Sequence, residues 1–346
     1  MYKVKGEPFR YKGVKNVEDC KTAEDVMVKA GLNFTVAKCK IFASMPGAVD
    51  FDNNINNGEQ FFHGSDSFKP LNNQFATYRT DLNIPLGLVK ERYTPVQNIE
   101  AFKFFDDAIG ENKAIWQTAG AFGNGERIFV SAKLPNSILV NGHDPIDNYL
   151  VFTTSHDGSS GVKILFTPIR VICQNTLNAA IKTSNNFISI RHTESSSKKL
   201  GEASQILGIT KKKVKDFSEE MERLTKIKMS DINAQEVFAK IVLSEKELGQ
   251  MNYAGYTVKD LINRQWRAIQ DSDISTNKIN VLCRMNDYYF NGIGQKEFLG
   301  TAYGVYNAVN GYYSNVDNVE GIKRMDTLLY GDKSKKIKLA SDILIN

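Results

Sequence analysis

Apolar positions follow two different periods along the chain, and the period changes near residue 195. Before that point, short apolar runs alternate with turn residues, a pattern typical of strands joined by hairpins. The clearest turn, Gly123-Asn124-Gly125-Glu126, joins apolar runs at residues 114–122 and 127–134. A second hairpin is predicted from the runs at residues 149–152 and 162–166. Successive hairpins predict an antiparallel sheet.

A short helix is expected at residues 22–30 of this first part, and two further helices are expected to pack on one face of the sheet. Residues 97–109 place apolar side chains at spacings of three and four, as an amphipathic helix does, and a second helix is expected to start near Asn175. Residues 46–73 are rich in Asn, Gly, Asp and Ser and therefore predict a long loop. The aromatic residues of this loop either anchor it to the core or stack on bases.

Beyond residue 195 the helical period dominates, and Ser230, Ser244 and Thr257 are placed as N-caps. We therefore predict an α+β fold, with an antiparallel sheet of hairpins backed by helices in residues 1–194 and a mainly helical region in residues 195–346. The helices of this second region are expected at residues 200–207, 211–229, 234–243, 258–270 and 279–289.

Composition limits the class of protein without naming a function. The 346 residues are 42% hydrophobic, which is enough for one large or two medium cores. No apolar run approaches the roughly 18 residues of a membrane span, and the start of the chain lacks the apolar segment of a secretory signal. A cytoplasmic protein without a membrane partner is expected.

Sequence signatures of enzymes are missing. The chain has no Walker GxxxxGK[ST], GxSxG, HExxH or strand-linked GxGxxG motif, and its four cysteines form no CxxC pair. The four histidines show no metal-ligand spacing. No catalytic residue, metal or cofactor is therefore predicted, and a metal-dependent nuclease built from scattered Asp and His residues is kept as an alternative.

Local charge says more than the net charge of +5. Between Lys198 and Lys228, nine basic residues stand against five acidic ones, which suits either a phosphate backbone or a solvated helix face. Eight tyrosines fall between residues 253 and 313, and Trp266 lies between Arg264 and Arg267. These aromatic side chains either stack on the bases of a single strand or pack helices together.

Six short segments carry a family resemblance. They are Leu86-Gly87-Leu88-Val89, Tyr93, Gln97-Asn98, Thr118-Ala119-Gly120, Thr154-Ser155-His156-Asp157-Gly158 and Arg170-Val171-Ile172-Cys173-Gln174-Asn175-Thr176-Leu177. The chain resembles a family of phage/plasmid-like proteins catalogued as a domain of unknown function, over about residues 89–200. Members are carried by phages, prophages and plasmids, so the resemblance implies such an origin and the cytoplasm of a bacterial host cell.

A weaker likeness is to phage single-strand annealing recombinases of the RecT, Redβ and Erf kind. These share a small antiparallel sheet backed by a long helix and oligomerise on single-stranded DNA through a basic groove. The likeness implies a protein that binds and anneals single-stranded DNA without covalent catalysis, as a homo-oligomer. It fits the missing enzyme signatures.

On this hypothesis, basic side chains contact phosphates, and the expected helix start at Asn175-Thr176 offers backbone N–H groups to another phosphate. Arg170 stands alone among apolar residues and needs an anionic partner, either such a phosphate or an internal acid. The other candidate contacts are Arg127, Lys133, Lys163, Arg191, Lys211, Lys212 and Lys213. A phage accessory protein that binds a host protein through the tyrosine-rich helical region is the main alternative.

Overall fold

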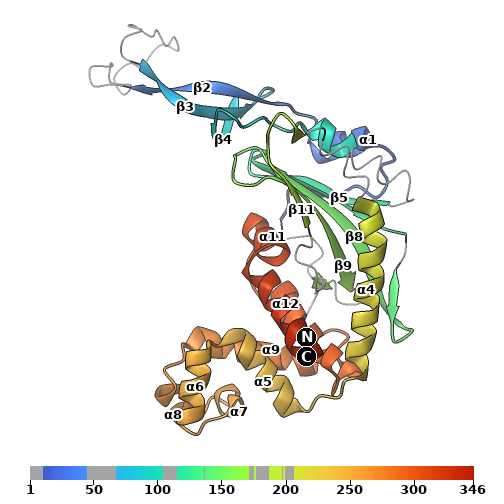
Figure 1. The fold of residues 1–346 in the computed structure, drawn as a ribbon, viewed down its shortest axis with the longest axis vertical. Helices are drawn as coiled ribbons and strands as arrows, with labels where there is room; N and C mark the ends of the chain where they lie inside the picture. The colour runs from blue at the N-terminus through green and yellow to red at the C-terminus, as the bar shows by residue number, and fades with distance from the viewer. Residues whose placement is uncertain are drawn as a thin grey trace.

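A computed structural model describes residues 11–44, 68–103, 115–135, 137–170, 175–176, 187–196, 198 and 206–346. Its centre is an eight-stranded sheet with the order β1-β5-β6-β8-β9-β10, in which β7 also pairs with β8 and β11 with β9 (Figure 1). Every pairing is antiparallel, so the predicted α+β class is confirmed. The strands are β1 (Val14–Asn16), β5 (Ile115–Phe122), β6 (Arg127–Lys133), β7 (Ile138–Val140), β8 (Asp144–Ser155), β9 (Val162–Arg170), β10 (Asn175–Thr176) and β11 (Phe187–Ile190).

The central strands read as continuous apolar runs because the large sheet is buried on both faces. In β6, Ile128 and Val130 belong to the main core, whereas Phe129 between them belongs to a smaller core on the opposite face. β9 repeats this alternation with Ile164 and Leu165. Each face therefore needs helices to cover it.

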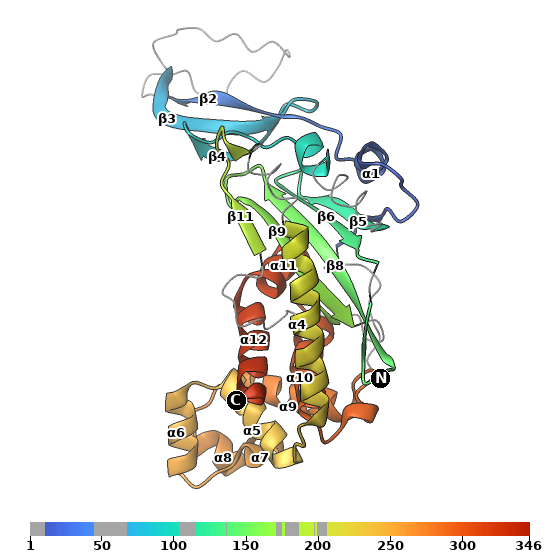
Figure 2. The same cartoon turned by 45° about the vertical axis from the view of Figure 1, so that its right-hand side comes forward.

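Helices from the second half of the chain supply this cover. The long α4 lies along one face, and α11 packs on the other through Met325 and Leu329 (Figures 1 and 2). Helices α5 to α9 form a lobe at one end of the molecule. The helices are α4 (Ile206–Lys226), α5 (Asp231–Val242), α6 (Glu245–Tyr253), α7 (Val258–Ile262), α8 (Trp266–Asp271), α9 (Thr276–Asn291), α10 (Ala302–Gly311), α11 (Gly321–Leu329) and α12 (Asp332–Ile345), with a 3-10 turn at Lys296–Phe298 and a π-helix at Tyr312–Val316.

Local signals set the starts of these helices. The Ser230 side chain caps α5, and the predicted caps Ser244 and Thr257 both form complete capping boxes. In the first half of the chain, Thr22 does the same for α1 (Ala23–Ala30), which packs near β5. Within the described residues, no helix combines the length and the apolar character needed to cross a bilayer.

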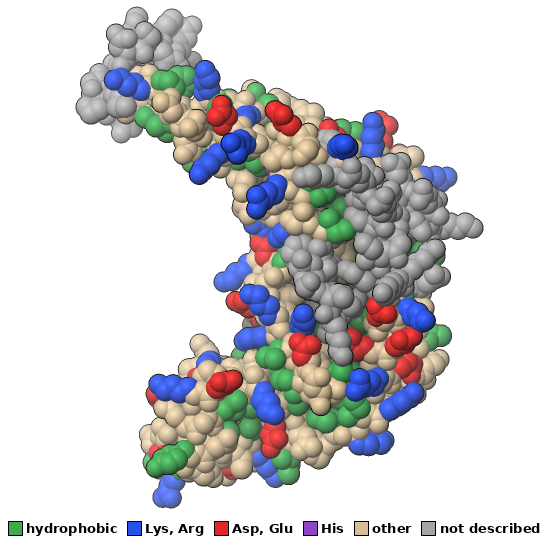
Figure 3. Space-filling model, viewed as in Figure 1, with side chains coloured by type: hydrophobic (Ala, Val, Ile, Leu, Met, Phe, Trp, Pro, Cys, Tyr) green, Lys and Arg blue, Asp and Glu red, His purple; other side chains and the backbone are tan. Residues whose placement is uncertain are grey.

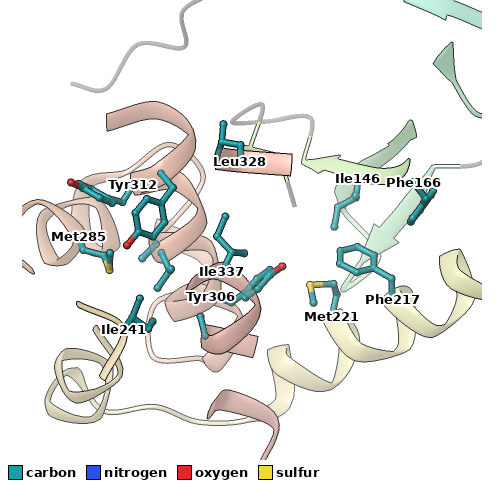
Figure 4. Packing of buried hydrophobic residues seen from close by; sticks show 14 of the residues in the cluster. Ile146, Phe166, Phe217, Met221, Ile241, Met285, Tyr306, Tyr312, Leu328 and Ile337 are labelled. Carbon is teal, nitrogen blue, oxygen red and sulfur yellow. The ribbon is translucent and has the colours of Figure 1, made fainter. Parts of the chain in front are cut away.

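Sheet and helices share one continuous hydrophobic core. Phe217 and Met221 of α4 face Ile146 and Phe166 of the large sheet, and the same cluster runs on to Ile337 in α12 (Figure 4). A hydrogen bond of 2.7 Å from the Tyr303 hydroxyl to Asp144 Oδ2 also ties α10 to the start of β8. The domain boundary placed near residue 195 stays a prediction.

A smaller three-stranded antiparallel sheet, which we call the β arm, projects from the end opposite the helical lobe (Figure 1). It consists of β2 (Val36–Ser44), β3 (Phe68–Arg79) and β4 (Ile84–Lys90). Thr77 Oγ1 donates to the His156 carbonyl at 2.6 Å, which joins the arm to the β8–β9 turn. A Cβ at Gly87 would lie 2.5 Å from the Asp157 backbone, so this close approach requires glycine.

Three sequence expectations are wrong in detail. Asn175–Thr176 is the strand β10 and not a helix start, because its backbone pairs with Arg170 and Ile169 of β9. The helix expected at residues 258–270 is two helices, α7 and α8, separated at Arg264. Residues 68–73, expected in a loop, belong to β3, and residues 45–67 lie outside the described residues.

Candidate nucleic-acid interface

One side of the molecule is hollowed between the β arm and the helical lobe. Figure 3 shows this side in profile, with Lys and Arg side chains along much of it and fewer Asp and Glu side chains among them. The β arm overhangs one end of the hollow, and the lobe that contains α6 and α8 closes the other (Figures 1 and 3).

The β arm is strongly basic in its three strands. β2, β3 and β4 together hold five Lys or Arg residues and no Asp or Glu. Residues 45–67, which are not described, add four acidic residues and no Lys or Arg. The positive charge is therefore a property of the strands and not of the whole hairpin. The five basic residues are Lys38, Lys40, Lys69, Arg79 and Lys90.

Two of these five cations hold the arm together. Arg79 forms a bidentate pair with Asp81, at 2.7 and 3.0 Å, and lies over the Phe34 ring. Lys38 donates to the carbonyls of Glu91 and Tyr93, at 2.6 and 3.0 Å. Both side chains are thus committed to internal contacts.

The other three cations, Lys40, Lys69 and Lys90, are exposed and have no ion pair within the described part of the chain. Lys40 lies opposite Phe75 and Lys90 opposite Gln74, and neighbouring residues of a strand point to opposite faces. The free charge therefore covers both faces of the arm.

Of the predicted cations on the large sheet whose side chains the structure describes, all but one have internal partners. Arg127 pairs with Asp326 and also donates to Ser159, and Lys133 pairs with Asp147 at 2.6 Å. Lys163 lies over the Tyr330 ring, 4.1 Å from its centre. Arg191 is exposed, and the described residues offer it no ion pair. Of these four side chains, Arg191 is therefore the most accessible to a phosphate.

The remaining predicted contacts are placed by their backbones alone. Arg170 ends β9, Asn175 and Thr176 form β10, and residues 211–213 belong to the first half of α4. The side chains of these residues lie outside the described part of the structure. Their contacts with DNA remain predictions.

The aromatic residues of the helical region divide into two groups. Six of the eight tyrosines between residues 253 and 313 are buried, which fits helix packing. Tyr253 at the end of α6 is 96% exposed, and Trp266 at the start of α8 is 64% exposed. The surface expected to bind a host protein is therefore largely core, and two aromatic side chains remain available to solvent.

Two buried histidines form the junction between the β arm and the large sheet. Asn98 donates its amide to the Leu32 carbonyl, so its oxygen faces His156 and accepts from Nε2 at 2.8 Å. His192 contacts Thr154 Oγ1 at 3.1 Å and stacks on Tyr93. Burial lowers the pKa of each histidine to about 4. Both rings are neutral at pH 7 and serve as structural hydrogen-bonding groups.

Metal chemistry finds no support at these histidines. Among the described residues, no group of three or more His, Cys, Asp or Glu side chains is arranged to hold a metal ion. The nuclease alternative therefore gains nothing from this part of the chain.

Comparison with known protein families gives one match. A family described as a domain of unknown function (DUF932) matches residues 85–339. The chain belongs to this family. No curated protein and no solved structure matches.

The DUF932 match begins in β4 and ends inside α12. It includes the large sheet from β5 onward and the whole helical lobe with Trp266, and it leaves out β1, α1, β2 and β3. Most of the β arm thus lies before the matched segment. The family description assigns no activity, so function has to be inferred from the surface.

The buried histidines should make the protein sensitive to mild acid. Their folded pKa lies below the unfolded value of about 6.5, so the unfolded chain binds more protons between pH 4 and 6.5. Stability present above pH 6.5 is lost as the pH falls. We expect a loss of about 1 kcal/mol for each histidine between pH 7 and 5.5, measured by urea unfolding. The double variant His156→Gln/His192→Gln should lose most of this dependence, and an unchanged dependence would contradict the assignment.

Proposed function

We propose that the protein binds single-stranded DNA along its hollow side and acts without covalent catalysis. The observation that carries the proposal is the β arm, whose strands hold five basic residues and no acidic one and leave three lysines exposed. Such a surface attracts a phosphate backbone irrespective of sequence. Self-association and an origin in a phage, prophage or plasmid belong to the same proposal.

The arrangement of the cations favours phosphate binding at the two ends of the hollow over phosphate binding on the large sheet. Arg127 and Lys133 already neutralise internal acids, so a phosphate would have to displace Asp326 or Asp147 to reach them. Exposed lysines on the β arm need no such exchange. Arg191, directly after β11, is the predicted sheet cation that supplements them among the side chains that the structure describes.

Fluorescence anisotropy with a labelled oligothymidine tests the proposal in the wild-type protein. Affinity should fall as salt rises, because each neutralised phosphate of a single strand contributes about −0.7 to the slope of log K against log salt. Three lysines alone give a slope of about −2. A duplex of the same length should bind more weakly, and the single strand should stay intact with or without chelator. Absence of binding at low salt would refute the proposal.

A protein partner is the second candidate, and exposed apolar side chains on the β arm favour it. Phe42, Leu71 and Leu88 are 54%, 45% and 69% exposed. A contiguous exposed apolar patch marks an interaction surface, and these three side chains come from the three adjacent strands of the arm. Binding to a protein through them would respond weakly to salt, which separates this candidate from DNA binding.

A further inference from the structure

The exposed tryptophan of the helical lobe stands out against the rest of the aromatic residues. The chain has two tryptophans, and Trp116 is 2% exposed whereas Trp266 is 64% exposed. A large apolar ring left in water loses the free energy that burial would give it. Tyr253, in the same lobe, is more exposed still. Both rings are open to a ligand that offers a flat apolar face.

Basic residues frame Trp266 on both sides of the chain. Arg264 and Arg267 are exposed, as are Gln265 and Trp266 between them. The nearby acids are engaged: Asp260 caps α7, and Asp271 accepts a hydrogen bond of 2.6 Å from the Tyr256 hydroxyl. Hydrogen bonding leaves both carboxylates charged, so the positive charge offered to a ligand is confined to the two arginine side chains beside Trp266.

The backbone at Arg264 is held in an unfavourable conformation. Arg264 has φ +57°, and among the described residues the other non-glycine positions with positive φ are all Asn or Asp, which tolerate it better. Gln265 N–H donates to the Asp260 carbonyl at 3.0 Å, which fixes the chain between α7 and α8. Asparagine or glycine would be less strained at this position, and the Arg264 side chain donates from Nη2 to Asn280 Oδ1 at 2.7 Å.

We propose that Trp266 stacks on an unpaired base of single-stranded DNA, with Arg264 and Arg267 on the adjoining phosphates and Tyr253 as a second stacking position. This inference rests on the proposed DNA binding and adds a reason for strand selectivity. Phosphates attract both single and double strands, whereas a base can lie flat on an indole once it is unpaired. On this proposal the β arm supplies positive charge at one end of the hollow, and Trp266 in the helical lobe stacks on an unpaired base at the other end.

Tryptophan fluorescence tests the inference directly. In a Trp116→Phe variant, Trp266 is the single tryptophan, and its emission should be quenched when oligothymidine is added. An oligonucleotide of the same length made of abasic sites keeps the phosphates and lacks the bases. It should bind by anisotropy without quenching Trp266. Oligothymidine binding without quenching would overturn the stacking site alone, and no binding of either oligonucleotide would overturn the proposed function as well.

Three variants complete the test. Trp266→Ala should lower the affinity for oligothymidine about 5- to 150-fold and leave that for the abasic strand unchanged. Ile232→Ala removes another apolar side chain that is 63% exposed, and it should leave both affinities unchanged. Arg264→Asn should weaken binding while keeping or raising the thermal midpoint, because it relieves the backbone. Equal affinities for Trp266→Ala and wild type would refute the stacking site.

Discussion

Replacing Phe217 with alanine is expected to lower the free energy of unfolding by about 3–5 kcal/mol, which is the usual cost of truncating a fully buried phenylalanine. Phe217 is 0% exposed in α4 and lies where this helix meets the large sheet. Because one core joins the sheet to the helices, both should lose stability together. The protein would then unfold as one cooperative unit.

Two spectroscopic signals can be followed during urea unfolding of this variant. In a Trp266→Phe background, fluorescence reports on Trp116 in the large sheet, and far-ultraviolet circular dichroism reports mainly on the helices. Both midpoints should fall together. Lys215→Ala on the exposed side of the same helix should change stability by less than about 0.5 kcal/mol. Separate transitions, with one midpoint unmoved, would instead support two independent domains.

The triple variant Lys40→Gln/Lys69→Gln/Lys90→Gln is expected to bind single-stranded DNA about 100-fold more weakly than wild type at 0.1 M salt. Each phosphate contact with a single strand contributes about 0.7 to the slope of log affinity against log salt. Over the one decade between 1 M and 0.1 M salt, three lost contacts therefore amount to about two decades of affinity. The three side chains are exposed and lack ion pairs in the described structure, so folding should be little affected.

A matched control removes three exposed lysines that lie outside the β arm. Lys12, Lys15 and Lys21 lie around β1 and α1, at the far edge of the large sheet, and are equally exposed. Their replacement by glutamine changes the net charge by the same amount. If both triple variants lost affinity equally, the net charge of the protein and not the β arm would explain the binding.

Local features of the fold could be predicted from the sequence because they are decided by neighbouring residues. The turn at Gly123 to Glu126 was identified by its glycines, two of which adopt positive φ, and the N-caps at Ser244 and Thr257 by their hydroxyls. Helix α8 was missed as a separate element because no glycine or proline marks the break at Arg264. Because the apolar spacing stays helical on both sides of Arg264, the sequence gives no sign that one helix ends and another begins there.

The partners of charged residues could not be predicted, since they lie far apart in the sequence. Arg127 pairs with Asp326, which is 199 positions away in the sequence. The five basic residues of β2, β3 and β4 form one basic surface because these strands pair in one sheet. Six tyrosines are core residues, whereas Trp266 and Tyr253 are exposed. Exposure depends on which helix faces meet, and helical periodicity alone does not specify that arrangement.

The salt dependence of binding tests the role of the β arm most directly. Log affinity for oligothymidine should be measured against log salt for the wild type, for the Lys40/Lys69/Lys90 glutamine variant and for the Lys12/Lys15/Lys21 glutamine variant. We expect the slope to become about 2 units shallower in the β-arm variant and to stay at the wild-type value in the control. An unchanged slope in the β-arm variant would show that these lysines do not contact DNA.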